Sequence, residues 1–83
     1  MKNIYVGNIS YSATEENIKE LFEQYGKVNS AKIVIDRYTQ RSKGFGFVEM
    51  ENENEADEAI NAINGFELSG RNLKVNEARE KRY

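Results

Sequence analysis

The fold is decided by the stretch Lys43-Gly44-Phe45-Gly46-Phe47-Val48-Glu49-Met50, whose side chains alternate with the period of a β-strand. In a strand, one side of the sheet receives Gly44, Gly46, Val48 and Met50, and the other receives Lys43, Phe45, Phe47 and Glu49. The apolar pair Val48 and Met50 predicts that the first side faces the core. Phe45 and Phe47 are therefore expected to face solvent.

The residues around this stretch predict two helices and three further strands. Alternation with a period of two predicts strands at 3–7, 31–35 and 71–78. Apolar residues spaced three and four apart predict helices within 12–25 and 51–63. Ser12 or Thr14 is expected to cap the first helix, and Asn52 the second.

The order strand-helix-strand-strand-helix-strand (βαββαβ) predicts an α+β fold, the ferredoxin-like sandwich. In that fold, a four-stranded antiparallel sheet carries both helices on one face and leaves the other face in water. The residues expected on the helix side of the further strands are Ile4, Val6, Ala31, Ile33, Ile35, Leu73 and Val75. Those expected on the solvent side are Asn3, Tyr5, Lys32, Val34, Lys74 and Asn76.

Length and composition favour one small binding domain over an enzyme. The chain has 83 residues with no cysteine and no histidine, which disfavours disulfides, thiolate metal sites and the commonest general base. We therefore expect no catalysis, no metal and no cofactor. One domain is expected at 1–78, with a short basic tail at 79–83 that is disordered in the free protein. No apolar run indicates a signal peptide or a membrane span, so we expect a cytoplasmic location. We also expect the protein to be a monomer.

The charges are distributed unevenly along the chain. The net charge is −2, but the two predicted helices hold nine of the fourteen acidic residues and one of the twelve basic residues. Helices that share one side of the sheet would therefore make an acidic back, and the rest of the molecule would be basic. A negative total charge does not exclude an anionic partner for such a molecule.

Three aromatic side chains are expected on the solvent side of the sheet, namely Tyr5, Phe45 and Phe47. Burying an aromatic side chain stabilises a fold by several kcal/mol, so a cluster left exposed indicates a binding surface. The cations Lys32, Arg41, Lys43 and Lys74 are expected on or beside the same face. Aromatic rings bordered by cations suit single-stranded nucleic acid, which needs surfaces for base stacking and charges for phosphates.

The octamer at 43–50 resembles the signature K/R-G-F/Y-G/A-F-V-x-F/Y of the RNA recognition motif at every position except the last, Met50. The segment Ile4-Tyr5-Val6-Gly7-Asn8-Ile9 resembles the companion hexamer on the first strand of that family. The resemblance extends over residues 2–78 and is to small single-domain bacterial proteins or to the domain part of glycine-rich RNA-binding proteins. It implies binding of single-stranded RNA and a post-transcriptional role.

The resemblance implies that Tyr5, Phe45 and Phe47 stack on the RNA and that Lys43 contacts phosphate. Asn3 and Asn76 carry amides that can hydrogen-bond to base edges. In the family, the last strand and the segment after it also contact RNA, which here implies Lys74, Asn76, Glu77, Ala78 and Arg79. The candidate RNA-binding residues are Asn3, Tyr5, Lys32, Arg41, Lys43, Phe45, Phe47, Lys74, Asn76 and Arg79.

Other functions remain open at this point. The aromatic side chains could form a core or a dimer interface, or bind a protein partner, and single-stranded DNA could replace RNA on a stacking surface. A nucleotide-binding glycine loop at Gly44-Phe45-Gly46 is excluded, because no third glycine and no helix follow. A small ferredoxin-like hydrolase is disfavoured, because the loop after Gly7-Asn8 contains no arginine to hold a phosphate.

Overall fold

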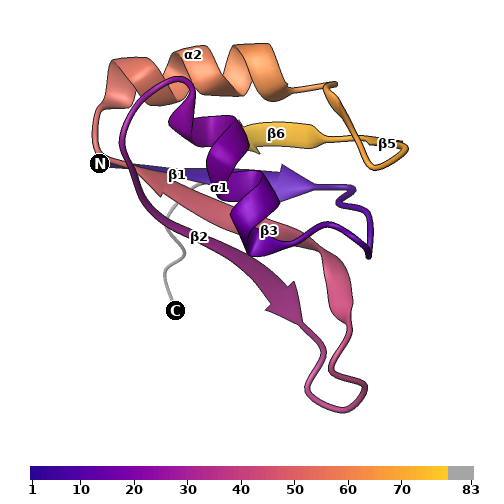
Figure 1. The fold of residues 1–83 in the computed structure, drawn as a ribbon. Coiled ribbons are helices and arrows are strands. Elements are labelled where there is room, and N and C mark those ends of the chain that lie inside the picture. Colours follow the sequence, from indigo (N-terminus) through magenta and orange to yellow (C-terminus); the bar gives the residue numbers. More distant parts are fainter. Residues whose placement is uncertain (79–83) are drawn as a thin grey trace.

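Strands β1 (Lys2–Gly7) and β3 (Ser42–Met50) form the centre of a four-stranded antiparallel sheet. The computed structural model describes residues 1–78, in which β2 (Val28–Ile35) and β6 (Lys74–Glu77) are the edge strands (Figure 1). The strand order is β2-β3-β1-β6, and Ile4 lies opposite Val48. The predicted βαββαβ order and the antiparallel sheet are both present.

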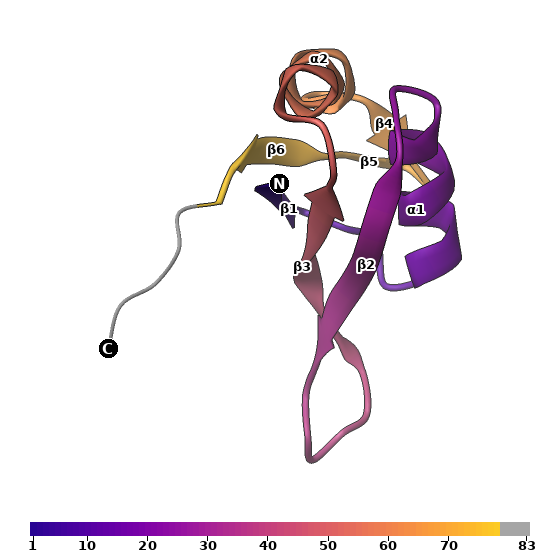
Figure 2. The same ribbon diagram turned by 90° about the vertical axis from the view of Figure 1, so that its left-hand side faces the viewer.

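Helices α1 (Glu15–Glu23) and α2 (Glu53–Ile63) cover one face of the sheet (Figures 1 and 2). Thr14, rather than Ser12, caps α1: its Oγ1 accepts from the Asn17 backbone N–H at 3.1 Å, and Asn17 Oδ1 accepts from the Thr14 N–H at 3.0 Å. Asn52 caps α2 as predicted. No helix within residues 1–78 is long and apolar enough to cross a membrane.

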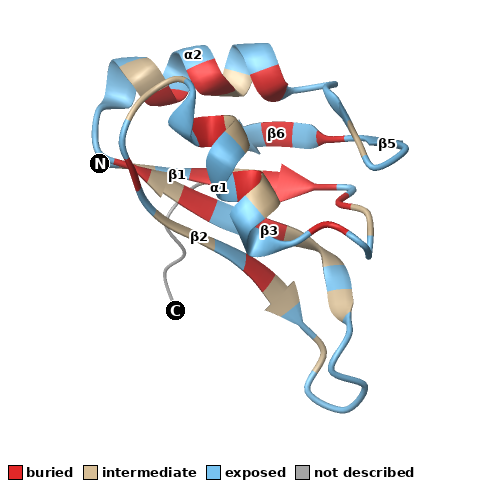
Figure 3. Cartoon of the chain, viewed as in Figure 1, coloured by how far each residue is buried: buried red, intermediate tan, exposed pale blue. Residues whose placement is uncertain are grey.

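The hydrophobic core lies between the helices and the sheet (Figure 3). Ile4, Val6, Val48 and Met50 point into it from the two central strands and are at most 1% exposed. Phe22 of α1 is fully buried against them. Burial of each of these side chains stabilises the fold by roughly 1.5–3 kcal/mol. The alternation along β1 and β3 therefore places the core as the sequence predicts.

Ile35 does not join the core, which corrects the prediction from strand alternation. It is 53% exposed, because the register of β2 against β3 shifts between Ile33 and Ile35. Ile33 is paired with Gly46, and a side chain at position 46 would collide with the Lys32 carbonyl oxygen and lie 2.9 Å from Ile33 Cα. The backbones of β2 and β3 approach closely here, and glycine is required at position 46.

The predicted last strand at 71–78 is also corrected, because only its second half joins the sheet. Residues Arg71–Asn72 form β5, which pairs with β4 (Glu67–Leu68) in a separate hairpin, and β6 begins at Lys74. Positive φ angles at Ser69 and Gly70 make the tight turn between β4 and β5. Asn8 Nδ2 donates to the Asn72 carbonyl at 2.8 Å and connects this hairpin to the end of β1.

Candidate functional site

Three aromatic rings lie side by side on the face of the sheet that the helices do not cover, here called the outward face. Tyr5 of β1 and Phe45 and Phe47 of β3 make up this aromatic triad. The distances between ring centroids are 5.9 Å for Tyr5 and Phe47 and 6.1 Å for each of the other two pairs. The rings are tilted or edge-on to one another, so each keeps part of its surface available for a stacked ring.

The triad is not part of the core. Phe47 is 40% exposed, and Tyr5 and Phe45 are half-buried, whereas the core side chains of the same strands are inaccessible to solvent. The half-burial arises because the rings cover one another and the sheet beneath them. The side chains are therefore held in place on strands while one surface of the cluster remains in water.

A row of polar and aromatic residues crosses all four strands through the triad. Lys32 of β2 pairs with Phe47, Phe47 pairs with Tyr5, and Tyr5 pairs with Asn76 of β6. Neighbouring strands are about 4.8 Å apart, so the four side chains stand in line on the outward face. The row has a cation at one end, an amide at the other, and two rings between them.

A second row of paired residues lies next to the first on the outward face. It contains Gly7, whose lack of a side chain leaves space for the Tyr5 ring. Gly7 of β1 pairs with Phe45 on one side and with Lys74 on the other. A Cβ atom at Gly7 would lie 2.5 Å from Tyr5 Oη and 2.8 Å from Tyr5 Cε2. The Tyr5 ring therefore leans along the strand and covers Gly7, which brings Tyr5 toward Phe45 and closes the triad.

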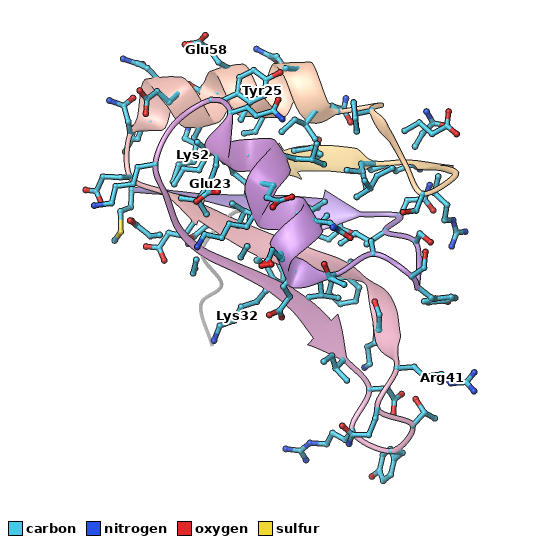
Figure 4. The ribbon with its side chains drawn as sticks, in the orientation of Figure 1. Lys2, Glu23, Tyr25, Lys32, Arg41 and Glu58 are labelled. Atoms are coloured by element: carbon cyan, nitrogen blue, oxygen red, sulfur yellow. The ribbon has the colours of Figure 1, made fainter. Side chains whose placement is uncertain are left out.

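The loop between β2 and β3 (residues 36–41) projects from the sheet and is internally bonded (Figure 1). Asp36 Oδ1 accepts from the backbone N–H groups of Tyr38 at 2.8 Å and Thr39 at 3.2 Å. These two hydrogen bonds, together with the nearby Lys43, hold the pKa of Asp36 below its ordinary value. The loop presents the exposed Arg41 side chain, which extends into solvent (Figure 4).

A hollow of about 860 Å³ lies between this loop and the segment that follows β1, and Phe45, Arg41 and Lys43 contribute to its lining. Tyr11, which is 70% exposed, lines its far side. Tyr11 is not among the residues predicted from the sequence, because a single tyrosine in a polar loop has no period that assigns it a face. The Ile9 N–H donates to the Gly44 carbonyl at 2.8 Å, and this bond joins the segment after β1 to the beginning of β3.

The remaining candidates lie around the triad. Asn3 is exposed on β1 opposite Glu49, and Lys74 is exposed on β6. Arg79 lies outside the described residues. Eight of the ten candidates thus lie on the described strands of the sheet, and Arg41 lies in the loop just before β3, where it lines the hollow beside Phe45 together with Lys43. On the helix side, the first turns of α1 and α2 carry acidic residues and their last turns carry no basic residue, and Lys2 Nζ of β1 forms a salt bridge with Asp57 Oδ1 of α2 at 2.6 Å.

Comparison with known proteins gives one family. The family model described as the RNA recognition motif matches residues 4–74. RbpE of Nostoc sp. is 51% identical over 77 residues, which cover 93% of this chain and 78% of RbpE. The chloroplastic RNA-binding protein CP31B of Arabidopsis thaliana is 50% identical over 78 residues, which cover 94% of this chain and 27% of CP31B.

Solved structures agree with these sequence matches. The crystal structure of RNA binding protein PG1 superimposes with a TM-score of 0.93 at 51% identity and covers all of both chains. A Sex-lethal protein–RNA complex superimposes with a TM-score of 0.92 at 30% identity and covers 98% of this chain and 48% of the other. These neighbours confirm the ferredoxin-like arrangement of the sheet and helices.

Proposed function

Because the chain belongs to the RNA recognition motif family, we propose that it binds single-stranded RNA on the outward face of its sheet, without catalysis. The observation that carries the proposal is the aromatic triad, which lies on the two central strands and is yet partly exposed. A domain that needed these rings only for stability would bury them. Stacking on bases gives their exposed surfaces a partner.

Each group around the triad has a proposed role. Tyr5 and Phe47 stack on neighbouring bases, and Phe45 packs against a sugar or a further base. Lys43 and Arg41 pair with phosphates, while Asn3 and Asn76 donate or accept at base edges. Lys32 and Lys74 add positive charge at the two sides of the face, and Arg79 adds a contact from beyond the described residues.

The proposed contacts imply modest affinity. A stacked base is worth about 1–3 kcal/mol by alanine substitution, and ordering the RNA opposes binding. Two or three stacked bases therefore predict a dissociation constant nearer micromolar than nanomolar. The corresponding biological proposal is a post-transcriptional role in the cytoplasm, in which the domain holds short unpaired segments of a transcript.

The proposal is tested by titrating the labelled protein with a short RNA of random sequence while recording amide chemical shifts, at low and at physiological salt. We expect the largest shifts at Tyr5, Lys43, Phe45 and Phe47, and weaker binding at higher salt. A DNA oligonucleotide of the same length measures the contribution of the 2′-hydroxyl groups. Shifts confined to the helices, or none at millimolar RNA, would reject the outward face as the RNA site.

Phe47→Ala is the single substitution that tests base stacking on the triad most directly. Loss of one stacked base should weaken RNA binding at least tenfold, or about 1.4 kcal/mol. Phe66→Ala is the matched control, because Phe66 is 44% exposed and lies beyond the end of α2, away from the triad. If a folded Phe47→Ala protein binds RNA with the same affinity as the wild type, the stacking role is rejected. The triad would then be assigned to binding of a protein partner, and that binding should depend only weakly on salt.

A further inference from the structure

Glu49 is the one carboxylate among the outward residues of the described strands, on a face proposed to bind a polyanion. It lies two residues after Phe47 on β3, so both side chains project from the same side of the sheet. The other charged residues there are Lys32, Lys43 and Lys74. A carboxylate repels phosphate, so a role in RNA binding requires a hydrogen-bond donor on the RNA.

The surroundings of Glu49 form a small groove beside the triad. Its volume is about 290 Å³, and it is lined by Asn3, Ser30, Lys32, Ile33, Val34, Phe47, Val48 and Glu49. This volume is at the lower limit for ligand sites and suits a single base. The lining is largely apolar, and Asn3, Ser30, Lys32 and Glu49 add an amide, a hydroxyl, an ammonium and a carboxylate to it. A base stacked on Phe47 would therefore present an edge to polar groups.

The polar groups are held in register on three adjacent strands. Glu49 of β3 pairs with Asn3 of β1 on one side and with Ser30 of β2 on the other. Glu49 is half-buried, and within residues 1–78 its carboxylate takes part in none of the salt bridges or side-chain hydrogen bonds found in the structure. Its two oxygens are thus available to a ligand in the groove.

We propose that this groove is a guanine-selective subsite in which the Glu49 carboxylate accepts from N1–H and the exocyclic N2 amino group of a base stacked on Phe47. This inference rests on the proposed RNA-binding function and adds the class of base. Guanine has two adjacent donors on its Watson–Crick edge, which match the two oxygens of a carboxylate. The Asn3 amide is placed to donate to the O6 carbonyl of the same base.

The other bases match Glu49 less well. Adenine and cytosine each present one amino group beside a ring nitrogen that is an acceptor, and uracil presents one N–H between two carbonyls. An acceptor facing a carboxylate is unfavourable, so each of these bases makes at most one good hydrogen bond there. The groove should therefore discriminate by the number of adjacent donors and not by ring size alone.

The test uses fluorescence anisotropy with six-nucleotide RNAs of uridine that carry one central guanosine, adenosine, cytidine or inosine. The wild-type protein should bind the guanosine RNA roughly tenfold more tightly than the adenosine and cytidine RNAs. Inosine lacks the exocyclic amino group and should bind with intermediate affinity. Equal binding of all four RNAs, or a preference for adenosine or cytidine, would overturn the guanine assignment.

Glu49→Gln keeps the shape of the side chain but replaces one acceptor oxygen with a donor group. Its preference for guanosine should fall to within about twofold, while its affinity for all-uridine RNA stays equal or rises because a negative charge is lost. Glu58→Gln removes the same charge from α2 on the helix side and should keep the preference (Figure 4). A Glu49→Gln protein that still prefers guanosine would disprove the role of Glu49.

The same measurements separate the two proposals. If the folded wild-type protein binds none of the RNAs, the RNA-binding function itself fails. If it binds all of them with micromolar affinity, and Phe47→Ala weakens binding of all of them without any preference for guanosine, RNA binding stands and only the guanine subsite is rejected. Amide spectra of each variant establish that it is folded.

Discussion

Glu15 Oε2, in the first turn of α1, accepts a hydrogen bond from the backbone N–H of Ile33 at 2.9 Å. Ile33 belongs to the edge strand β2 and lies where its register shifts against β3. The helix side chain therefore satisfies a donor on the exposed edge of the sheet, which would otherwise be open to pairing with another strand. The same bond fixes the start of α1 relative to β2.

Glu15→Ala should lower the free energy of unfolding by about 1–2 kcal/mol, because it leaves the Ile33 N–H with only water as a partner. Denaturant unfolding measures the loss, and hydrogen exchange at the Ile33 amide should accelerate. Glu16→Ala is the control, because Glu16 is exposed in the same turn of the helix. Equal stability of the two variants would show that the Glu15 bond contributes nothing.

Gly7→Ala should weaken RNA binding through the position of Tyr5. The added methyl group would lie 2.5 Å from Tyr5 Oη, so the ring must move off the strand and away from Phe45. We expect a loss of roughly three- to tenfold in affinity, part of the worth of one stacked base. Calorimetric titration measures it, and combining Gly7→Ala with Tyr5→Ala should add little beyond Tyr5→Ala alone. Additive losses would contradict this explanation.

The loop at 36–41 should lose order in acid before the core does. The pKa of Asp36 is lowered from 3.8 by the N–H groups of Tyr38 and Thr39. The carboxylate therefore stabilises the loop above its unfolded pKa, and this contribution disappears as pH falls through the lower folded value. Amide spectra recorded across this acidic range should show the Tyr38 and Thr39 signals shifting while the signal of Val48 in the core does not. Simultaneous changes at all three would indicate global unfolding instead.

Lys43→Gln should reduce the dependence of RNA binding on salt. Each phosphate contact on a single strand contributes about −0.7 to the slope of log affinity against log salt concentration, so losing one should flatten the slope by that amount. Lys27→Gln serves as the control, because Lys27 precedes β2 and is not among the candidates. An unchanged slope in the Lys43 variant would place that side chain away from phosphate.

The sequence predicted the features of the fold that follow from the periodicity of strands and helices. Alternation identified the faces of β1 and β3, and the spacing of Ile18 and Phe22 identified the buried side of α1. These patterns depend only on strand and helix geometry, which every residue of an element shares. The aromatic triad was predictable for the same reason, because its members occupy outward positions on the two central strands.

Features that depend on contacts between distant segments were not predictable. Ile35 is exposed because β2 shifts against β3, and alternation along a single strand carries no information about such a shift. The hairpin of β4 and β5 has strands of two residues each, too short for a period, although Ser69-Gly70 is a turn signal. The hollow beside Tyr11 and the groove beside Glu49 arise only when loops or strands meet.

Alternation along β3 assigns the core and the proposed RNA surface at the same time, and this limits how the chain can vary. Substitutions can alter either face of β3 separately, since Phe47 and Val48 point in opposite directions. Deleting one residue within the strand would instead exchange the faces, exposing the core side chains and turning the rings inward. We therefore expect β3 to tolerate substitutions but no change in length, whereas the sheet should survive a change in the length of the loop at 36–41.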